Sequence, residues 1–144
     1  MKNNEKGITL VALVITIIVL LILAGVTILA LSGDNGILNR ASQSKVSTEI
    51  ANAKDAFTTV AAEGITEYYN SKYVEGNNTE TATLQKTVYD KITSSSISST
   101  FVNTTSSTSP STIVTNVNDA TGAALTATID TNGKITWKND KMTK

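Results

Sequence analysis

The first part of the chain is dominated by one uninterrupted apolar stretch. No charged residue occurs from Ile8 to Leu31, which read ITLVALVITIIVLLILAGVTILAL. At about 1.5 Å per residue, a helix of these 24 residues spans about 36 Å. A bilayer core is about 30 Å thick, so the stretch predicts a membrane-spanning helix. It is too long for the apolar part of an ordinary secretory signal.

A glycine-rich break follows the apolar stretch, with the sequence Ser32-Gly33-Asp34-Asn35-Gly36. Two glycines around Asp-Asn are a strong turn signal. We therefore expect a helix break at Gly33 and Gly36, with Gly33 in a left-handed cap and Asn35 capping the next helix. Such a break either lets the helix bend when it packs into a fibre or is a plain turn at the membrane exit.

From Ile37 to about Tyr73 the pattern becomes amphipathic. Apolar or small residues recur at spacings of three and four, which is typical of a helix with one buried face. These residues are Val46, Ile50, Ala53, Phe57, Val60, Gly64 and Tyr68. Together with the apolar stretch, this segment predicts a long N-terminal helix that is either continuous or interrupted at the glycines.

Two polar segments follow. Thr83–Thr93 predicts a short helix that buries Leu84, Val88 and Ile92. From Thr93 to Thr112, 15 of 20 residues are Ser or Thr. This composition favours an exposed loop, with a strand inside it where the apolar residues fall. Those residues are Ile97, Phe101 and Val102.

The last third has the pattern of strands. Alternation is weak over Thr112–Val117 and clearer over Ala124–Asp130 and Lys134–Lys138. Asn132-Gly133 between the last two runs predicts a hairpin. The side chains expected to cover the apolar stripe of the second helix are Leu125, Ala127, Ile129, Ile135 and Trp137. The pattern predicts an α+β fold, in which the apolar half of a long helix protrudes from a small antiparallel β-sheet head.

The composition excludes several classes of partner and of functional site. The 144 residues include 12 basic and 12 acidic side chains, and a net charge of zero argues against a nucleic-acid partner. Because the chain has neither Cys nor His, the usual zinc, haem and thiol chemistries lack their ligands. No catalytic motif occurs, so we expect no enzyme, no cofactor and no metal. Asp119, Asp130 and Asp140 could hold calcium, but surface turns explain them more simply.

The start of the apolar stretch has the most specific pattern. Its residues Lys6-Gly7-Ile8-Thr9-Leu10-Val11-Ala12-Leu13 resemble the prepilin motif of type IV pilins and of type II secretion pseudopilins, in a version similar to that of Gram-positive anaerobic bacteria. The resemblance implies that a membrane peptidase cuts after Gly7 and that Ile8 becomes a methylated N-terminus. The family usually has Glu at the fifth mature position, where this chain has Ala12. The departure leaves the implied processing unchanged, but the charge pair with a neighbouring N-terminus that the family uses in assembly has no carboxylate at this position.

By this resemblance, the chain is a pilin-like α+β protein with four parts. They are a leader at 1–7, a transmembrane and filament-core helix at 8–31, an amphipathic second part at 32–73, and a loop and antiparallel sheet head at 74–144. The residues expected to pack in the filament core are Ile8, Leu10, Val11, Ala12, Leu13, Ile15, Ile18, Leu21, Ile22 and Gly25.

Two functions remain open. In the first, the chain is a structural subunit of an extracellular, type IV pilus-like filament of identical subunits. Its implied partners are the prepilin peptidase, an assembly machinery and, before assembly, the inner membrane. In the second, the chain is a monomeric, single-pass membrane-anchored surface domain that binds a ligand or a cell-wall component. The motif covers only about the first 25 residues, so the remaining chain supports the first function through architecture alone.

Overall fold

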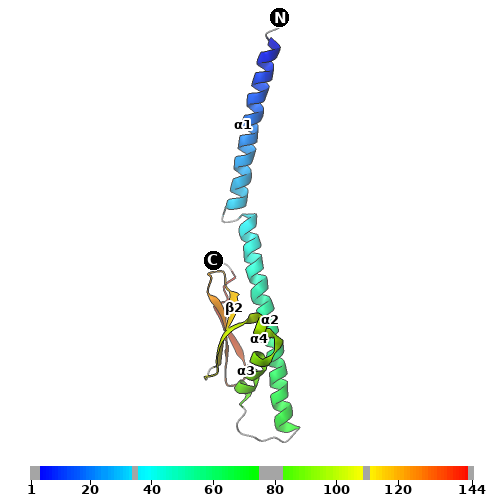
Figure 1. Ribbon diagram of the computed structural model, residues 1–144, viewed down its shortest axis with the longest axis vertical. Coiled ribbons are helices and arrows are strands. Elements are labelled where there is room, and N and C mark those ends of the chain that lie inside the picture. Colours follow the sequence, from blue (N-terminus) through cyan, green and yellow to red (C-terminus); the bar gives the residue numbers. More distant parts are fainter. Residues whose placement is uncertain (1–3, 34–35, 75–82, 109–110, 143–144) are drawn as a thin grey trace. The chain divides into compact units, whose positions relative to one another are not determined.

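The computed structural model describes residues 4–33, 36–74, 83–108 and 111–142. The protein is α+β, with a long helical N-terminal region followed by a small antiparallel sheet (Figure 1). The chain divides into two compact units, Met1–Ser42 and Gln43–Lys144. We call the second unit the head. The α+β prediction is confirmed at this level.

The first unit contains helix α1 (Asn4–Ser32) and the start of helix α2 (Ile37–Tyr73). The amide of Gly33 continues the helical pattern by donating to the Leu29 carbonyl at 3.2 Å. The carbonyl of Gly33 then accepts from the Gly36 amide at 2.7 Å and from Asn39 Nδ2 at 3.1 Å. The left-handed cap predicted at Gly33 is therefore wrong, because Gly33 keeps a negative φ. The cap predicted at Asn35 lies outside the described residues.

At Gly36, lack of space for a side chain requires glycine. A Cβ atom at this position would lie 2.5 Å from the Leu31 carbonyl oxygen and 2.8 Å from that of Gly33. No side chain fits there without moving the backbone. Gly36 also accepts the amide of Arg40 at 3.1 Å, which closes the first turn of α2.

In the head, α2 buries one face. The buried residues of α2 are Ile50, Ala53, Phe57, Val60, Ala61 and Gly64. Val46 and Tyr68, at the two ends of the predicted stripe, are half-buried. The spacing of three and four therefore predicted the covered face correctly.

The sheet is a four-stranded antiparallel meander in the order β1-β2-β3-β4. Its strands are β1 (Val102–Ser106), β2 (Ser111–Asn118), β3 (Ala124–Ile129) and β4 (Ile135–Lys138). Burial alternates along β2 and β3, since every second side chain faces the helices. The hairpin predicted at Asn132-Gly133 is confirmed, because β3 pairs with β4 and Ile129 lies opposite Ile135.

Helix α3 (Leu84–Ser94) matches the predicted short helix. Thr83 caps it, since its hydroxyl accepts the Lys86 amide at 3.2 Å. Val88 and Ile92 are buried, whereas Leu84 is half-buried. The buried Gln85 joins the helix to the sheet by donating from Nε2 to the Ile129 carbonyl at 2.6 Å.

The serine- and threonine-rich run is more ordered than expected. The strand expected within it is confirmed as β1, which begins at Val102, whereas Ile97 and Phe101 lie in helix α4 (Ser96–Phe101) and not in a strand or loop. Ile97 and Phe101 are four residues apart, and both pack against the core, which gives the polar run one apolar helical edge. Ser95 separates α3 from α4, and its hydroxyl donates to the Ile92 carbonyl at 2.7 Å.

Two hairpin turns share one design. In each, an aspartate begins a loop whose fourth residue is glycine at positive φ: Gly122 at 85° and Gly133 at 74°. Oδ1 of Asp119 accepts the amides of Thr121 and Ala123 at 2.8 and 3.0 Å. Oδ1 of Asp130 likewise accepts the amides two and four residues later, at 2.8 and 2.9 Å. Asp119 and Asp130 are therefore turn residues, as the simpler interpretation held.

Candidate functional site

The largest exposed feature is the surface of α1. From Gly7 to Ser32, every residue is exposed. Ile8 is 70% exposed, Leu21 67% and Leu29 76%. A helix that is apolar all round and has no protein cover is typical of a membrane span or of a helix that neighbouring chains enclose.

The backbone and hydroxyl groups of α1 suit an apolar surrounding. Thr16 Oγ1 donates to the Leu13 carbonyl at 2.7 Å, and Thr27 Oγ1 donates to the Leu23 carbonyl at 2.7 Å. These hydroxyl protons are satisfied within the helix itself, so they need no water. Among the described residues, one helical stretch is long and apolar enough to cross a membrane; it lies near the N-terminus and its apolar window is unburied. A secretory signal meets the same criterion.

The ten residues expected in a filament core all lie on α1. They are exposed and surround the helix instead of forming one face. Ala12 and Gly25 are the small members of the set, and a Cβ at Gly25 would meet nothing within 4 Å. Packing against the described part of the chain therefore does not explain the glycine. Small residues let neighbouring helices approach closely within a membrane.

The predicted cleavage bond, between Gly7 and Ile8, lies near the start of α1. Both residues are exposed, and a Cβ at Gly7 would meet nothing within 4 Å. The structure thus places the bond in the open and gives Gly7 no packing role. The helix break at Gly33 and Gly36 lies at the other end of α1.

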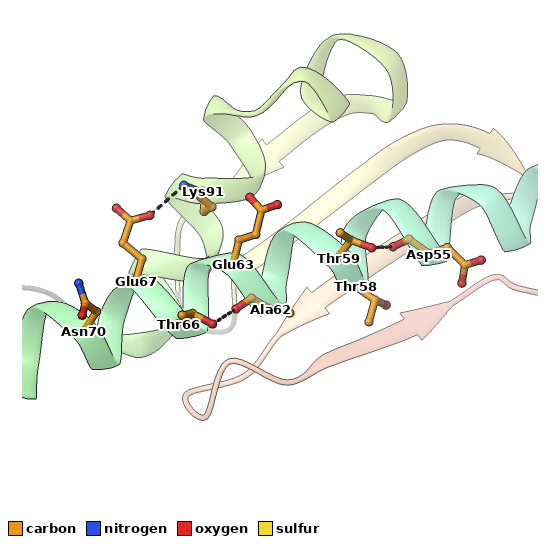
Figure 2. A pocket seen from close by; sticks show the side chains of 9 residues that line it. All are labelled: Asp55, Thr58, Thr59, Ala62, Glu63, Thr66, Glu67, Asn70 and Lys91. Atoms are coloured by element: carbon orange, nitrogen blue, oxygen red, sulfur yellow. Dashed lines mark hydrogen bonds and ion pairs between the residues drawn. The ribbon is translucent and has the colours of Figure 1, made fainter.

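The head carries a second candidate site, an open groove of about 1150 Å³. We call this feature the groove. Its wall is the solvent-facing side of α2 from Asp55 to Asn70, together with Lys91 of α3 (Figure 2). Figure 2 shows Glu63 reaching from the helix toward the side of Lys91 and Asp55 reaching toward the other side, with Thr59 and Ala62 between them along the helix.

The groove is acidic, and two of its threonine hydroxyls donate to carbonyl groups of α2. Thr59 Oγ1 donates to the Asp55 carbonyl at 2.9 Å, and Thr66 Oγ1 donates to the Ala62 carbonyl at 2.8 Å, so these hydroxyl protons are already used. Lys91 Nζ donates to Glu67 Oε2 at 2.9 Å, which raises the pKa of Lys91 above its usual value. Within the described part of the chain, Asp55 and Glu63 form no ion pair.

Three tyrosines form an aromatic cluster at the C-terminal end of α2. The rings of Tyr69 and Tyr73 are stacked at 5.9 Å, and Tyr68 meets Tyr69 edge-on at 5.3 Å. Lys72 Nζ lies 5.5 Å from the Tyr68 ring and 5.6 Å from the Tyr73 ring. The Tyr68 hydroxyl accepts a long hydrogen bond from Lys72 and raises the pKa of that ammonium group. Lys72 of the same chain therefore lies against the Tyr68 and Tyr73 rings.

The acidic residues of the head do not gather into a metal site. Over the described ranges, no group of three or more His, Asp or Glu residues could hold a metal ion. Asp140, the third aspartate that the sequence singled out, pairs with Lys54 Nζ at 2.7 Å. This contact lowers the pKa of the Asp140 carboxyl group, because Lys54 donates a hydrogen bond to its charged form.

No family model, curated protein or solved structure matches this chain. The candidate sites therefore stand on the residues and their geometry. The groove is the feature that sequence reasoning missed. The solvent-facing positions of α2 were visible in its periodicity, but the pairing of Glu67 with Lys91 joins residues 24 apart in sequence. No local pattern predicts that contact.

Proposed function

We propose that the protein is a structural subunit of an extracellular, type IV pilus-like filament, held together through its N-terminal apolar helix. The observation that carries the proposal is α1, a helix whose large apolar side chains are all exposed and which begins with the motif Lys6-Gly7-Ile8-Thr9-Leu10. Such a surface needs cover, because apolar surface is unfavourable in water. The membrane supplies that cover before assembly, and copies of α1 supply it afterwards.

The character of α1 fits both surroundings. Apolar surface in lipid is already out of water, so association of these helices must come from close packing instead of the hydrophobic effect. Gly25, open on all sides, allows such an approach. With Ala12 at the fifth mature position, no carboxylate pairs with a neighbouring N-terminus. Shape and the contacts of the heads must therefore set the register of the subunits.

The size of the head also supports the proposal. Its core consists of two small clusters of buried side chains, and no disulfide reinforces it since the chain has no cysteine. Domains of this size gain only a modest stability from their own core. Contacts with neighbouring heads would add to it by mass action.

Intact mass spectrometry of extracellular material tests the proposal. We expect sheared filaments that contain a chain beginning at Ile8 with one added methyl group. A chain that retains Met1, or one that begins at Gly33, contradicts the proposal. The Gly7→Leu variant should block both cleavage and filaments, since bulk at the end of the leader hinders the peptidase.

The Gly25→Leu variant is the matched control. Both glycines are open in the isolated chain, so neither substitution creates a clash within it. We expect Gly25→Leu to be cleaved normally but to form fewer filaments, because it obstructs only the packing of α1. If the chain is a monomeric anchored domain, neither variant differs from the parent chain in N-terminal processing, and electron microscopy shows no fibres.

The monomeric alternative has one observation in its favour, the groove of the head. An open acidic groove with two carboxylates that form no ion pair among the described residues is a suitable binding surface for a cationic group. The absence of fibres, together with an uncleaved N-terminus, would favour this alternative.

A further inference from the structure

We infer that the groove of one head receives the β4 edge of a second copy, so that two lysines of one subunit pair with two carboxylates of the next. The inference rests on the proposed function, in which copies of the chain lie side by side, and names the surfaces by which the heads meet. The acceptor surface is the groove, with Asp55 and Glu63. The donor surface, which we call the lysine row, is Lys134, Thr136 and Lys138.

The lysine row lies on the outer face of the sheet. Side chains alternate along β4 and the residue before it, with Lys134, Thr136 and Lys138 exposed and Ile135 and Trp137 half-buried. Trp137 faces inward, since its ring meets Phe57 of α2 at 5.4 Å. The two lysines therefore point away from α2, from a strand at the edge of the sheet.

Among the residues that the structure describes, neither lysine of the lysine row, Lys134 or Lys138, forms an ion pair. The nearest aspartate in sequence, Asp130, uses Oδ1 to accept the amides of Asn132 and Lys134 at 2.8 and 2.9 Å. The groove has the opposite surplus in Asp55 and Glu63. The positive charges of the lysine row are therefore complementary to the negative charges of the groove.

The spacing of the charges along the two elements is also similar. Asp55 and Glu63 are eight residues apart on a helix, which corresponds to about 12 Å along its axis and about 80° around it. Lys134 and Lys138 are four residues apart in extended chain, which corresponds to about 13 Å. Between the charges, the groove has the small residues Thr59 and Ala62, and the lysine row has only Thr136. The two surfaces can approach without a bulky side chain between them.

The two surfaces lie on opposite sides of the head. The sheet and α2 pack their inner faces together, so the groove faces outward from the helix layer and the lysine row outward from the sheet layer. One head cannot satisfy its own groove. A contact between two different surfaces repeats from copy to copy, and it produces a ring or an open polymer instead of a two-fold dimer.

Cross-linking in the full-length chain tests this contact, because the protein has no cysteine of its own. The Thr59→Cys/Thr136→Cys double variant leaves every charge in place and puts one thiol in the centre of each surface. After oxidation we expect a ladder of dimers, trimers and larger species on a denaturing gel. The Thr59→Cys and Thr136→Cys single variants should give no species beyond a dimer. The matched control is Thr48→Cys/Thr136→Cys, since Thr48 is exposed on α2 but lies outside the groove, and it should give no ladder.

Charge reversal in this cross-linking background tests the electrostatic pairing. Glu63→Lys or Lys138→Glu alone should reduce the cross-linked fraction about tenfold, since each reversal turns an attraction into a repulsion. The two reversals together should restore the ladder. A ladder of equal strength from the control pair, or one that no reversal alters, overturns the inference; the lysines then only keep the edge strand from pairing.

The readouts separate this inference from the proposed function. Methylated filaments that begin at Ile8 but give no ladder overturn the groove contact and leave the proposed function standing. A charge-dependent ladder from an uncleaved, membrane-bound chain without fibres supports the contact and overturns the filament.

Discussion

Trp137 meets Phe57 edge to face, with ring centroids 5.4 Å apart and an angle of 74° between the ring planes. This contact joins the edge strand β4 to the centre of α2, and Phe57 is fully buried. The Trp137 indole therefore fixes the position of a strand that has only one neighbouring strand. Since β4 also carries the lysine row, the aromatic pair determines where the proposed contact surface lies.

We predict that Phe57→Ala destabilises the head by about 3–5 kcal/mol, because it leaves a cavity at the centre of the core. A double-mutant cycle of Phe57→Leu with Trp137→Leu should give a coupling energy of about 0.5–1.5 kcal/mol. Urea unfolding of the detergent-solubilised full-length chain, followed by circular dichroism, measures both. Thr136→Ala faces the other side of β4 and should be additive with Phe57→Leu. Additivity of the two aromatic variants would show that the rings do not interact.

Gly64 marks the closest approach of α2 to α3. A Cβ at Gly64 would lie 3.1 Å from the Val88 Cα atom and 3.2 Å from the Lys91 Cβ atom. Alanine usually stabilises a helix by about 1 kcal/mol relative to glycine. We predict that Gly64→Ala shows none of this gain, and that Gly64→Val destabilises the head by about 1–3 kcal/mol by pushing α3 away. Urea unfolding checks both values, and a stabilising Gly64→Ala would contradict the close contact.

The elements of this fold were predictable where their periodicity is strong. Ile37–Tyr73 and the hairpin strands have enough apolar residues, at regular spacing, for the local pattern to agree with the tertiary contacts. The Ser/Thr-rich run was predicted less well, because only Ile97 and Phe101 indicate its helical edge. Their effect depends on the core that they contact. Composition alone cannot report such a contact.

The candidate sites were predictable to different degrees. The apolar surface of α1 is a property of continuous sequence, so the hydropathy pattern by itself indicates it. The groove is not a property of continuous sequence, because it combines the outward side of α2 with Lys91 from α3. Gly33 shows a third case: glycine suggested a left-handed cap, but the break is built on hydrogen bonds to the Gly33 carbonyl and on the tight fit at Gly36.

The two turn glycines form a natural pair for comparison. Both have positive φ, but a Cβ at Gly122 would meet nothing within 4 Å, whereas one at Gly133 would lie 3.2 Å from Leu84 Cγ and 3.3 Å from Val88 Cγ2. We predict that Gly122→Ala destabilises the head by about 1–2 kcal/mol through backbone strain alone. Gly133→Ala should be more damaging, because it adds the contact with α3 to the same strain. If thermal unfolding shows that the two variants lose the same stability, α3 moves away from the added methyl group without cost.

Asp119 predicts how the stability of the head depends on pH. The Thr121 hydroxyl donates to Asp119 Oδ1 at 2.6 Å, and with the amides of Ala123 and Thr121 it lowers the pKa of this carboxyl group below 3.8. Because the folded pKa lies below the unfolded one, the ionised carboxylate stabilises the head above about pH 4. This contribution disappears as the pH falls through the folded pKa.

We therefore expect the free energy of unfolding to be flat from about pH 7 to pH 5 and to fall below about pH 4. Thr121→Ala removes the largest cause of the lowered pKa and should weaken this acid dependence. Thr131→Ala, in the equivalent turn at Asp130, is the control and should leave the acid dependence unchanged. The backbone amides that still donate to Asp119, together with Asp140, whose pKa Lys54 lowers, account for the dependence that remains in Thr121→Ala. An unchanged acid profile in Thr121→Ala would contradict the assignment to Asp119.

The membrane location of α1 can be tested independently of filaments. Leu21 lies near the middle of the apolar stretch and is 67% exposed, so Leu21→Lys replaces a side chain that is not part of a buried core. A lysine at the centre of a membrane helix costs about 3 kcal/mol on insertion scales. We predict that Leu21→Lys lowers the fraction of protein retained in alkali-washed membranes. Leu38→Lys is the control, since Leu38 is 63% exposed but lies beyond the apolar stretch. Both proposed functions require the span, so equal retention of the two variants would contradict them together.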